Sequence, residues 1–250
     1  MRDTRKDESY WQGVFEDLDW TINFARNLLR EPDRPLDKMI MPTADLEADH
    51  LKLTNALYSS GAPIPDCVAQ ARSLLMEAYP GFVDACRRAS KQAMSGWHGG
   101  TDMRTRYLAL AVLCRLTPDE ARPLVEALDF WPERDAVWER FIALLGLGEG
   151  RPPVNTLVWA DAYAPLLEAL DPEISDFERK AALHTFDKGW LKEMRKSTSP
   201  RYSNHNNKHN TYVGYWNFEA AGAAAAMGID DSLLEGSKTY PKDWADWAKG

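Results

Sequence analysis

Two histidines in the C-terminal third of the chain have the residue type and spacing that metal chemistry requires. His205 and His209 are four residues apart, so on a helix they would share one face, as paired zinc ligands do. Helical zinc hydrolases carry a glutamate directly after the first histidine, but position 206 is Asn, and the nearby asparagines and Pro200 disfavour a helix. We therefore interpret this segment as a solvated loop and expect no metal, no cofactor and no catalytic residue in the chain.

Glu219 is the candidate for acid–base chemistry, and it stands among apolar residues one turn after Tyr215. A buried carboxylate needs polar partners, so we expect Glu219 to be largely buried and hydrogen-bonded near Tyr215 or Trp216, where it stabilises the fold. The alternative is a helical hydrolase or metal-binding enzyme that uses Glu219 together with His205 or His209. That alternative lacks a second convergent catalytic signature.

The segment Trp-His-Gly-Gly-Thr at 97–101 also draws attention, because paired glycines can approach a phosphate closely. It matches neither the phosphate-loop nor the dinucleotide-binding pattern, and a turn between two helices explains it. The cysteines are odd in number and far apart, with no zinc or disulfide spacing, which predicts three reduced thiols: Cys67, Cys86 and Cys114.

The elements that carry these residues are predicted to be helices. Apolar residues recur with a period near 3.6 along most of the chain, and alternating strand patterns are scarce. We expect an all-α protein with about ten helices, packed as antiparallel pairs in one compact body. Thr43 and Thr117 are predicted to cap helices, and Gly61 and Gly228 to end them. In the C-terminal half we expect helices over 156–170, 175–192 and 212–227.

Composition sets limits on the function. The 250 residues carry a formal net charge of −8, which argues against general nucleic-acid binding because phosphate contacts need clustered Lys and Arg. The longest apolar stretch, 220–229, is about half of the ~20 residues that a membrane span requires. The first residues have no apolar core of a signal peptide. We expect a cytoplasmic protein without a membrane anchor.

The charge is unevenly distributed in the C-terminal half. Between 161 and 178 every charged residue is acidic: Asp161, Glu168, Asp171, Glu173, Asp176 and Glu178. Such a run is often only a solvated face. The functional interpretation is a partner-binding surface that meets a basic protein, because complementary charge accelerates encounter and helps to select the partner.

A further set of residues carries a resemblance to a known family. It comprises an aromatic segment that leads into an alanine-rich stretch, an acidic pair and a Tyr-Pro pair: Tyr212, Gly214, Tyr215, Trp216, Phe218, Glu219, Asp230, Asp231, Tyr240 and Pro241. The spacing resembles the C-terminal module of the PoNi (polymorphic nuclease immunity) family. More loosely, Arg2-Asp3 with Tyr10, the stretch 56–61 and the stretch 107–113 are similar to its N-terminal module. The resemblance implies a helical N-terminal module over 1–120 and a helical C-terminal module over 121–250.

The resemblance also implies a function. Members of the family are cytoplasmic, non-catalytic proteins that bind and neutralise a nuclease toxin, often one delivered by a type VI secretion system. The expected partner of this chain is a cognate DNase effector, whose DNA-binding or active-site surface it would block without binding nucleic acid itself. The oligomeric state stays open, with a homodimer of the free protein as one alternative.

Overall fold

The computed structural model describes residues 1–95, 101–196, 205–206 and 209–250. Every regular element in these residues is a helix, and the helices pack in pairs, so the predicted all-α class is confirmed. Contacts between residues divide the chain into two compact units. Each unit is described by itself.

The first unit comprises Met1–His98, Glu126–Phe130 and Ser203–Gly214. Its main elements are the long helices α1 (Glu8–Leu29) and α2 (Ile40–Ser60), the short η1 (Leu36–Lys38), and a run formed by α3 (Ile64–Ser73), the π-helical turn η2 (Leu74–Ala78) and α4 (Tyr79–Arg88). Helix α1 packs along α2, and α2 contacts α3 and α4.

The ends of α2 show one prediction confirmed and one that is wrong. Gly61 ends the helix with a φ of 95°, in the left-handed region that glycine adopts without strain. Thr43 does not cap the helix, because α2 begins earlier, at Ile40. The Thr43 hydroxyl instead donates back to the carbonyl groups of Met39 and Ile40, each at 2.8 Å.

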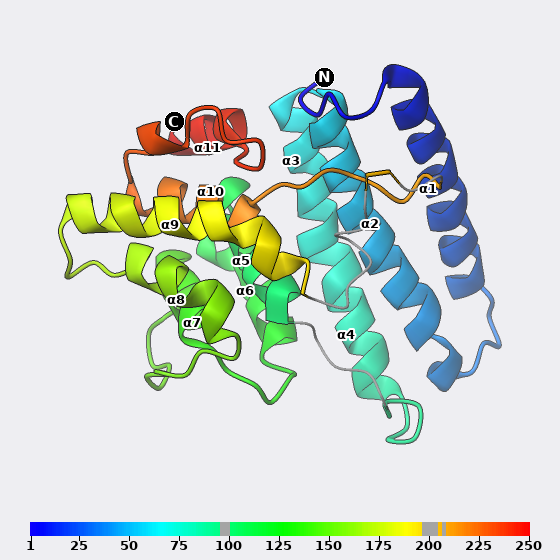
Figure 1. Cartoon of the computed structure of the whole chain (residues 1–250). Helices are drawn as coiled ribbons and strands as arrows, with labels where there is room; N and C mark the ends of the chain where they lie inside the picture. Colours follow the sequence, from blue (N-terminus) through cyan, green and yellow to red (C-terminus); the bar gives the residue numbers. More distant parts are fainter. Residues whose placement is uncertain (96–100, 197–204, 207–208) are drawn as a thin grey trace. The chain divides into compact units, whose positions relative to one another are not determined.

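The second unit comprises Gly99–Val125, Trp131–Tyr202 and Tyr215–Gly250. Its elements are α5 (Thr101–Leu113), most of α6 (Pro118–Leu128), α7 (Ala136–Leu144), α8 (Ala160–Ala169), α9 (Asp176–Met194), α10 (Phe218–Met227), η4 (Ser232–Leu234) and α11 (Lys242–Lys249). Helix α8 pairs with α9, and α10 packs against α5 and α11, as can be followed in green, yellow, orange and red in Figure 1. The predicted start of α6 is confirmed, since Thr117 and Glu120 exchange hydrogen bonds at 2.9 and 3.4 Å.

The predicted motif helix over 212–227 starts later than expected. Helix α10 begins at Phe218, because the side chain of Asn217 accepts a hydrogen bond from the backbone N–H of Ala220 at 3.0 Å and so caps the helix. The preceding residues are not helical, and Gly214 has a φ of 105°. At its other end α10 stops at Gly228, whose φ of 63° confirms the predicted left-handed C-cap.

Candidate functional site

The predicted acidic surface lies on the helix pair α8 and α9 and on the turn that joins them. Helix α9 starts at a capping box. The backbone N–H of Ser175 donates to the Glu178 carboxylate at 2.9 Å, and the Ser175 hydroxyl accepts from the N–H of Glu178 at 3.3 Å. The Ser175 hydroxyl also donates to the Glu178 carboxylate at 2.7 Å, and the hydrogen bonds that this carboxylate accepts from the hydroxyl and the N–H of Ser175 lower the pKa of Glu178. They also hold the turn before α9 in one conformation.

The six predicted carboxylates differ in what they do. Asp161, Glu168 and Glu173 are exposed on α8 and the turn. Asp171 is half-buried and accepts a hydrogen bond from the backbone N–H of Glu173 at 3.0 Å. Asp176 is exposed but forms an ion pair with Arg179. The structure therefore brings the six onto one helix pair, although part of their charge serves the local structure.

Two arginines that lie outside the stretch 161–178 reduce its negative charge. The Arg179 guanidinium donates to the carbonyl groups of Asp171 and Pro172 at 3.2 and 3.3 Å, in addition to its pair with Asp176. Arg140, on α7, reaches to 4.0 Å from the Asp171 carboxylate. The acidic surface is therefore edged by positive charge on the side of α7.

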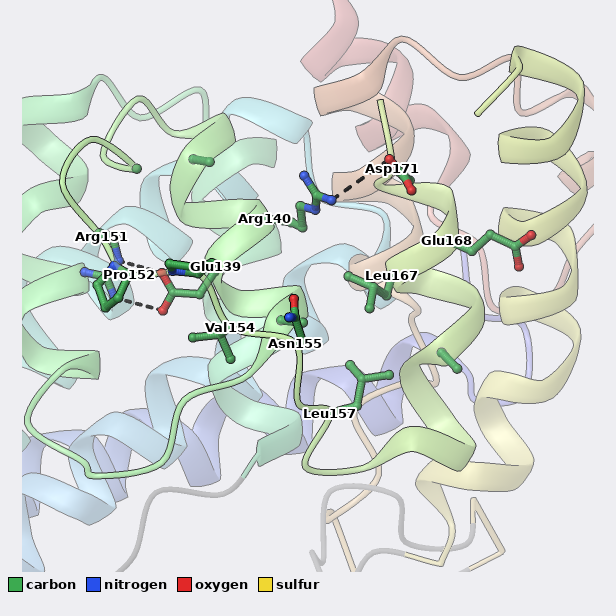
Figure 2. A pocket seen from close by; sticks show the side chains of 15 residues that line it. Glu139, Arg140, Arg151, Pro152, Val154, Asn155, Leu157, Leu167, Glu168 and Asp171 are labelled. Carbon is green, nitrogen blue, oxygen red and sulfur yellow. Dashed lines mark hydrogen bonds and ion pairs between the residues drawn. The ribbon is translucent and has the colours of Figure 1, made fainter. Parts of the chain in front are cut away.

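An open cleft of about 590 Å³ lies beside this surface, between α7 and α8 (Figure 2). One wall is α7 and the other is α8, and the segment 148–157 closes the end between them. Most of the lining is small or apolar, contributed by Ala136, Ala143, Gly148, Pro152, Pro153, Val154, Leu157, Ala164 and Leu167. Glu168 and Asp171, two of the predicted carboxylates, lie at its α8 wall.

Asp135 fixes the geometry of this cleft. Its carboxylate caps α7 by accepting from the N–H of Val137 at 2.8 Å, and it also accepts from the N–H of Val158 at 2.7 Å. The N–H of Ala136 donates to the carbonyl of Thr156 at 2.8 Å. Asp135 is 1% exposed, and this burial raises its pKa. One buried side chain thus ties the segment that precedes α8 to the start of α7.

Glu139 forms the strongest ion pairs at the cleft. Its carboxylate lies 2.7 Å from the Arg134 guanidinium and 2.6 Å from that of Arg151. Partial burial alone would raise the pKa of Glu139, but the hydrogen bonds and charges of Arg151 and Arg134 outweigh that effect and lower the pKa. These three side chains bind one another, whereas the Arg140–Asp171 pair at 4.0 Å is loose and exposed.

Glu219 is fully buried, as predicted, but its main partner is an arginine that the sequence analysis did not anticipate. Arg106 on α5 donates to both carboxylate oxygens at 3.2 and 3.4 Å, and also to the backbone carbonyl of Trp216 at 3.0 Å. The Arg106 side chain is 3% exposed and the Glu219 side chain 0%. A carboxylate held in this way has no access to a substrate, which leaves the alternative of a hydrolase based on Glu219 without its acid–base group.

The other motif residues in the second unit are also in contacts that hold helices together. The Phe218 ring packs edge-on against the Trp244 ring at 5.2 Å, and the Arg195 guanidinium lies 5.1 Å from the centre of the Tyr215 ring. Tyr240 and Pro241 are buried before α11.

The acidic pair of the motif joins η4 to its neighbours. Asp230 forms an ion pair with Lys180 on α9, and the hydrogen bonds from Lys180 and Ser232 lower its pKa to about 2. Asp231 accepts a hydrogen bond from the Tyr240 hydroxyl at 2.6 Å and lies 3.1 Å from the Lys249 ammonium group. These contacts connect η4 with α9 and α11.

In the first unit, Tyr212 is fully buried and its hydroxyl donates to the Asp3 carboxylate. The Tyr10 hydroxyl donates to the carbonyl of Tyr212 at 2.9 Å. The ring of His205 packs edge-on against that of Tyr212 at 5.9 Å. Asp3 and Tyr10 belong to the loosely matching N-terminal residues, so the contacts place them beside the first residue of the C-terminal motif.

Some predicted features fall outside the described residues or find no counterpart among them. The loop at 97–101 lies outside the residues whose side chains are described, as do residues 207 and 208 between the two histidines. Within the described part of the chain, no group of three or more His, Cys, Asp or Glu side chains could hold a metal ion. All three cysteines are buried, and none of them forms a disulfide bond. None of the described helices combines the length and apolar character needed to cross a bilayer.

Sequence reasoning missed the cleft, Arg140 and the buried Asp135. Asp135 did carry a signal, because an Asp directly before an apolar helical pattern is a preferred N-cap. Arg140 had none, since nothing in the order of residues places it opposite Asp171. The segment 146–153 has the Gly and Pro residues of a connector between helices, although its last residues line the cleft.

Three comparisons relate this chain to known proteins. A crystal structure of protein PA2201 from Pseudomonas aeruginosa is similar over 99% of this chain and 90% of that one, with a TM-score of 0.69 and 16% sequence identity, which shows a shared fold. No curated protein matches the chain in sequence. The family model for the C-terminal part of PoNe immunity proteins (PoNi) matches residues 133–244, a range that includes every residue lining the cleft. The resemblance predicted from the sequence is thereby confirmed for residues 133–244, which are similar to the C-terminal part of PoNe immunity proteins.

Proposed function

We propose that this protein is an immunity protein that binds a cognate nuclease toxin and neutralises it. The observation that carries the proposal is the match of residues 133–244 to the C-terminal part of PoNe immunity proteins. The burial of Glu219 in its pair with Arg106 supports a role for the motif in stability. Neutralisation is then stoichiometric binding, without catalysis by this chain.

The proposed mode of inhibition is steric blockage of the surface with which the nuclease holds DNA. A nuclease must present Lys and Arg to the phosphate backbone. The exposed carboxylates Asp161, Glu168 and Glu173 offer those cations an alternative set of anions. The protein need not imitate the shape of DNA, because a bound partner of this size excludes the substrate from the surface that it covers.

The setting is part of the same proposal. The toxin would be a DNase effector delivered by a type VI secretion system, and this protein would meet it in the cytoplasm of the cell that it protects. Such a role requires rapid capture, because one uninhibited nuclease damages the chromosome catalytically. Complementary charge raises association rates by orders of magnitude, which suits a protein with a net charge of −8.

A titration of nuclease activity tests the proposal. The nuclease encoded by the neighbouring gene is purified and its cleavage of plasmid DNA is measured with increasing amounts of this protein. We expect cleavage to stop at a fixed molar ratio, and a complex to elute as one peak in size-exclusion chromatography. An unrelated DNase serves as the control and should stay active. Undiminished cleavage at a tenfold excess, with no complex, would refute the proposal.

A further inference from the structure

The cleft between α7 and α8 has room that the protein's own side chains leave unfilled. Ala143 on α7 and Ala164 on α8 are both exposed, and both line the cleft. Alanine at these positions keeps the walls shallow, while the half-buried Leu157 and Leu167 supply apolar surface. At about 590 Å³ the space is within the roughly 300–1,000 Å³ of pockets that hold drug-sized ligands, so it can take several side chains of a partner.

The charged side chains around the cleft differ in the strength of their ion pairs. Glu139 is bound by Arg134 and Arg151 at 2.7 and 2.6 Å. The Arg140–Asp171 pair is longer, at 4.0 Å, and its side chains are 46% and 35% exposed. An exposed pair of this kind contributes little to stability, so Asp171 can exchange Arg140 for another cation at low cost. Glu168 stands one turn before Asp171 and also lines the cleft, but its carboxylate points away from Arg140 and Leu167 (Figure 2).

We propose that the nuclease inserts an apolar side chain into this cleft, the socket, and that a Lys or Arg of the nuclease beside that side chain replaces Arg140 as the ion-pair partner of Asp171. The inference rests on the proposed function and adds to it the place of contact. The apolar lining accepts the inserted side chain, and the Asp171 carboxylate, which faces Arg140, matches the positive charge that a nuclease presents to DNA. A second copy of this chain fits less well, since each copy carries a net charge of −8.

The cleft is also preorganised for binding. Asp135 joins the start of α7 to the segment that precedes α8 by hydrogen bonds of 2.8 and 2.7 Å. The pair of Glu139 with Arg151 holds the segment 148–157 against α7. Because its walls are fixed before the partner arrives, little conformational entropy is lost on binding. The residues that dominate protein interfaces bind in pockets that become well packed and desolvated in the complex.

Two substitutions that fill the cleft test the proposal directly. Ala164→Trp and Ala143→Trp place a large side chain on each wall. Both positions are exposed, but Ala143 also packs against Gly148, so Ala164→Trp is the variant that the fold tolerates more easily. Ala69→Trp is the matched control: Ala69 is an exposed alanine on a helix of the first unit and does not line the cleft. Binding to a catalytically inactive form of the nuclease encoded by the neighbouring gene is measured by biolayer interferometry, with thermal melting of each variant alongside.

We expect Kd to rise at least tenfold for Ala164→Trp and Ala143→Trp and to stay unchanged for Ala69→Trp, with all melting temperatures within a few degrees of the parent protein. If both cleft variants bind like the parent protein, the socket is refuted and the immunity function stands. If the parent protein itself does not bind the nuclease, the proposed function fails and the socket with it. A dimer of the parent protein in light scattering that Ala164→Trp converts to a monomer would assign the cleft to a second copy and overturn the proposal.

Substitutions of Asp171 and Arg140 test the second part of the proposal, the exchange of ion-pair partners at Asp171. Asp171→Asn should weaken binding severalfold, because the entering cation loses its partner. Arg140→Gln should strengthen binding or leave it unchanged, because it removes the cation that competes for Asp171. Weaker binding after Arg140→Gln, with Asp171→Asn unchanged, would show that the nuclease brings a carboxylate to Arg140, which contradicts the proposed polarity.

Discussion

At the scale of single residues, the pair of Arg106 and Glu219 determines how the motif of the C-terminal module contributes to the protein. Both charges are removed from water, so their attraction offsets a large desolvation cost. The guanidinium also lies 5.6 Å from the centre of the Trp190 ring and 5.7 Å from that of Phe218. The pair therefore connects α5, α9 and the start of α10 at one point in the core of the second unit.

Replacing Glu219 with Ala is expected to lower the free energy of unfolding by about 3–5 kcal/mol, because it leaves the Arg106 guanidinium charged and without its carboxylate in the interior. Urea unfolding followed by tryptophan fluorescence measures this change. The double variant Arg106→Met with Glu219→Leu should lose much less stability, since neither charge is then buried. A Glu219→Ala variant that melts like the parent protein but no longer protects against the nuclease would assign Glu219 to the interface.

The sequence predicted one half of this pair and could not predict the other. Glu219 stands inside an apolar pattern, and burial follows from that position alone. Arg106 is 113 residues away, on α5, and no periodic signal relates the two positions. The local sequence pattern thus identified the buried carboxylate that needs an ion-pair partner, whereas the identity of that partner depends on the tertiary structure.

At the scale of elements, the close approach of α10 to α5 depends on small side chains. A Cβ added to Gly222 would lie 2.8 Å from the Ala109 Cβ and 2.9 Å from both its Cα and its carbonyl oxygen. Those backbone atoms cannot move aside without displacing α5. The alanines on either side of Gly222, Ala221 and Ala223, are also buried.

Gly222→Ala is therefore expected to destabilise the protein, although alanine has the higher helix propensity by about 1 kcal/mol. Overpacking of a close helix contact costs about 1–3 kcal/mol, which outweighs the propensity gain. Gly189→Ala on α9 is the matched control, since nothing lies within 4 Å of its added Cβ, and it should stabilise the protein by several tenths of a kcal/mol. Differential scanning calorimetry of both variants gives the comparison. Equal shifts of the same sign would contradict this account of the contact.

The sequence predicted the end of this helix correctly but misplaced its start. The alanine-rich pattern predicts a close helix neighbour, and the left-handed Gly228 marks the end of α10 correctly. The aromatic residues 212–216 continue the apolar pattern, and for that reason a helix was expected from 212. Asn217 interrupts it because its side chain caps α10 and also donates to the Asp187 carboxylate at 3.0 Å. That second bond, to a residue far away in the sequence, is what a local pattern cannot show.

At the scale of the whole molecule, the net charge and its distribution over the surface affect the rate at which the protein associates with a partner. Asp161, Glu168 and Glu173 are exposed and serve neither a helix cap nor an ion pair among the interactions described above. Their charges extend into solvent and are screened over ~8 Å at physiological ionic strength. The six carboxylates could be predicted from the sequence as a group, and Arg179 follows them directly, but the position of Arg140 beside Asp171 could not be predicted.

A triple variant tests the role of this charge in association. Asp161→Asn, Glu168→Gln and Glu173→Gln together should slow association with the nuclease and weaken its salt dependence, while dissociation changes little. Stopped-flow association rates between about 20 and 300 mM salt measure the effect. The control triple Asp33→Asn, Asp66→Asn and Glu235→Gln alters net charge equally at exposed positions elsewhere. If both triple variants slow association to the same extent, the net charge of the protein determines the association rate, and the acidic surface on α8 and α9 makes no specific contribution.

The contact between α5 and α10 limits where two related genes can recombine and still encode a stable protein. The stretch that matches the immunity family, 133–244, contains α10 with Gly222 but not α5 with Ala109. A recombination event that exchanges only the matched stretch between two related genes would place one parent's α10 against the other parent's α5. Position 109 must then be small in the recipient, or the hybrid loses the contact that buries the motif. Viable hybrids should therefore join upstream of residue 101, so that α5 is inherited together with the module that it supports.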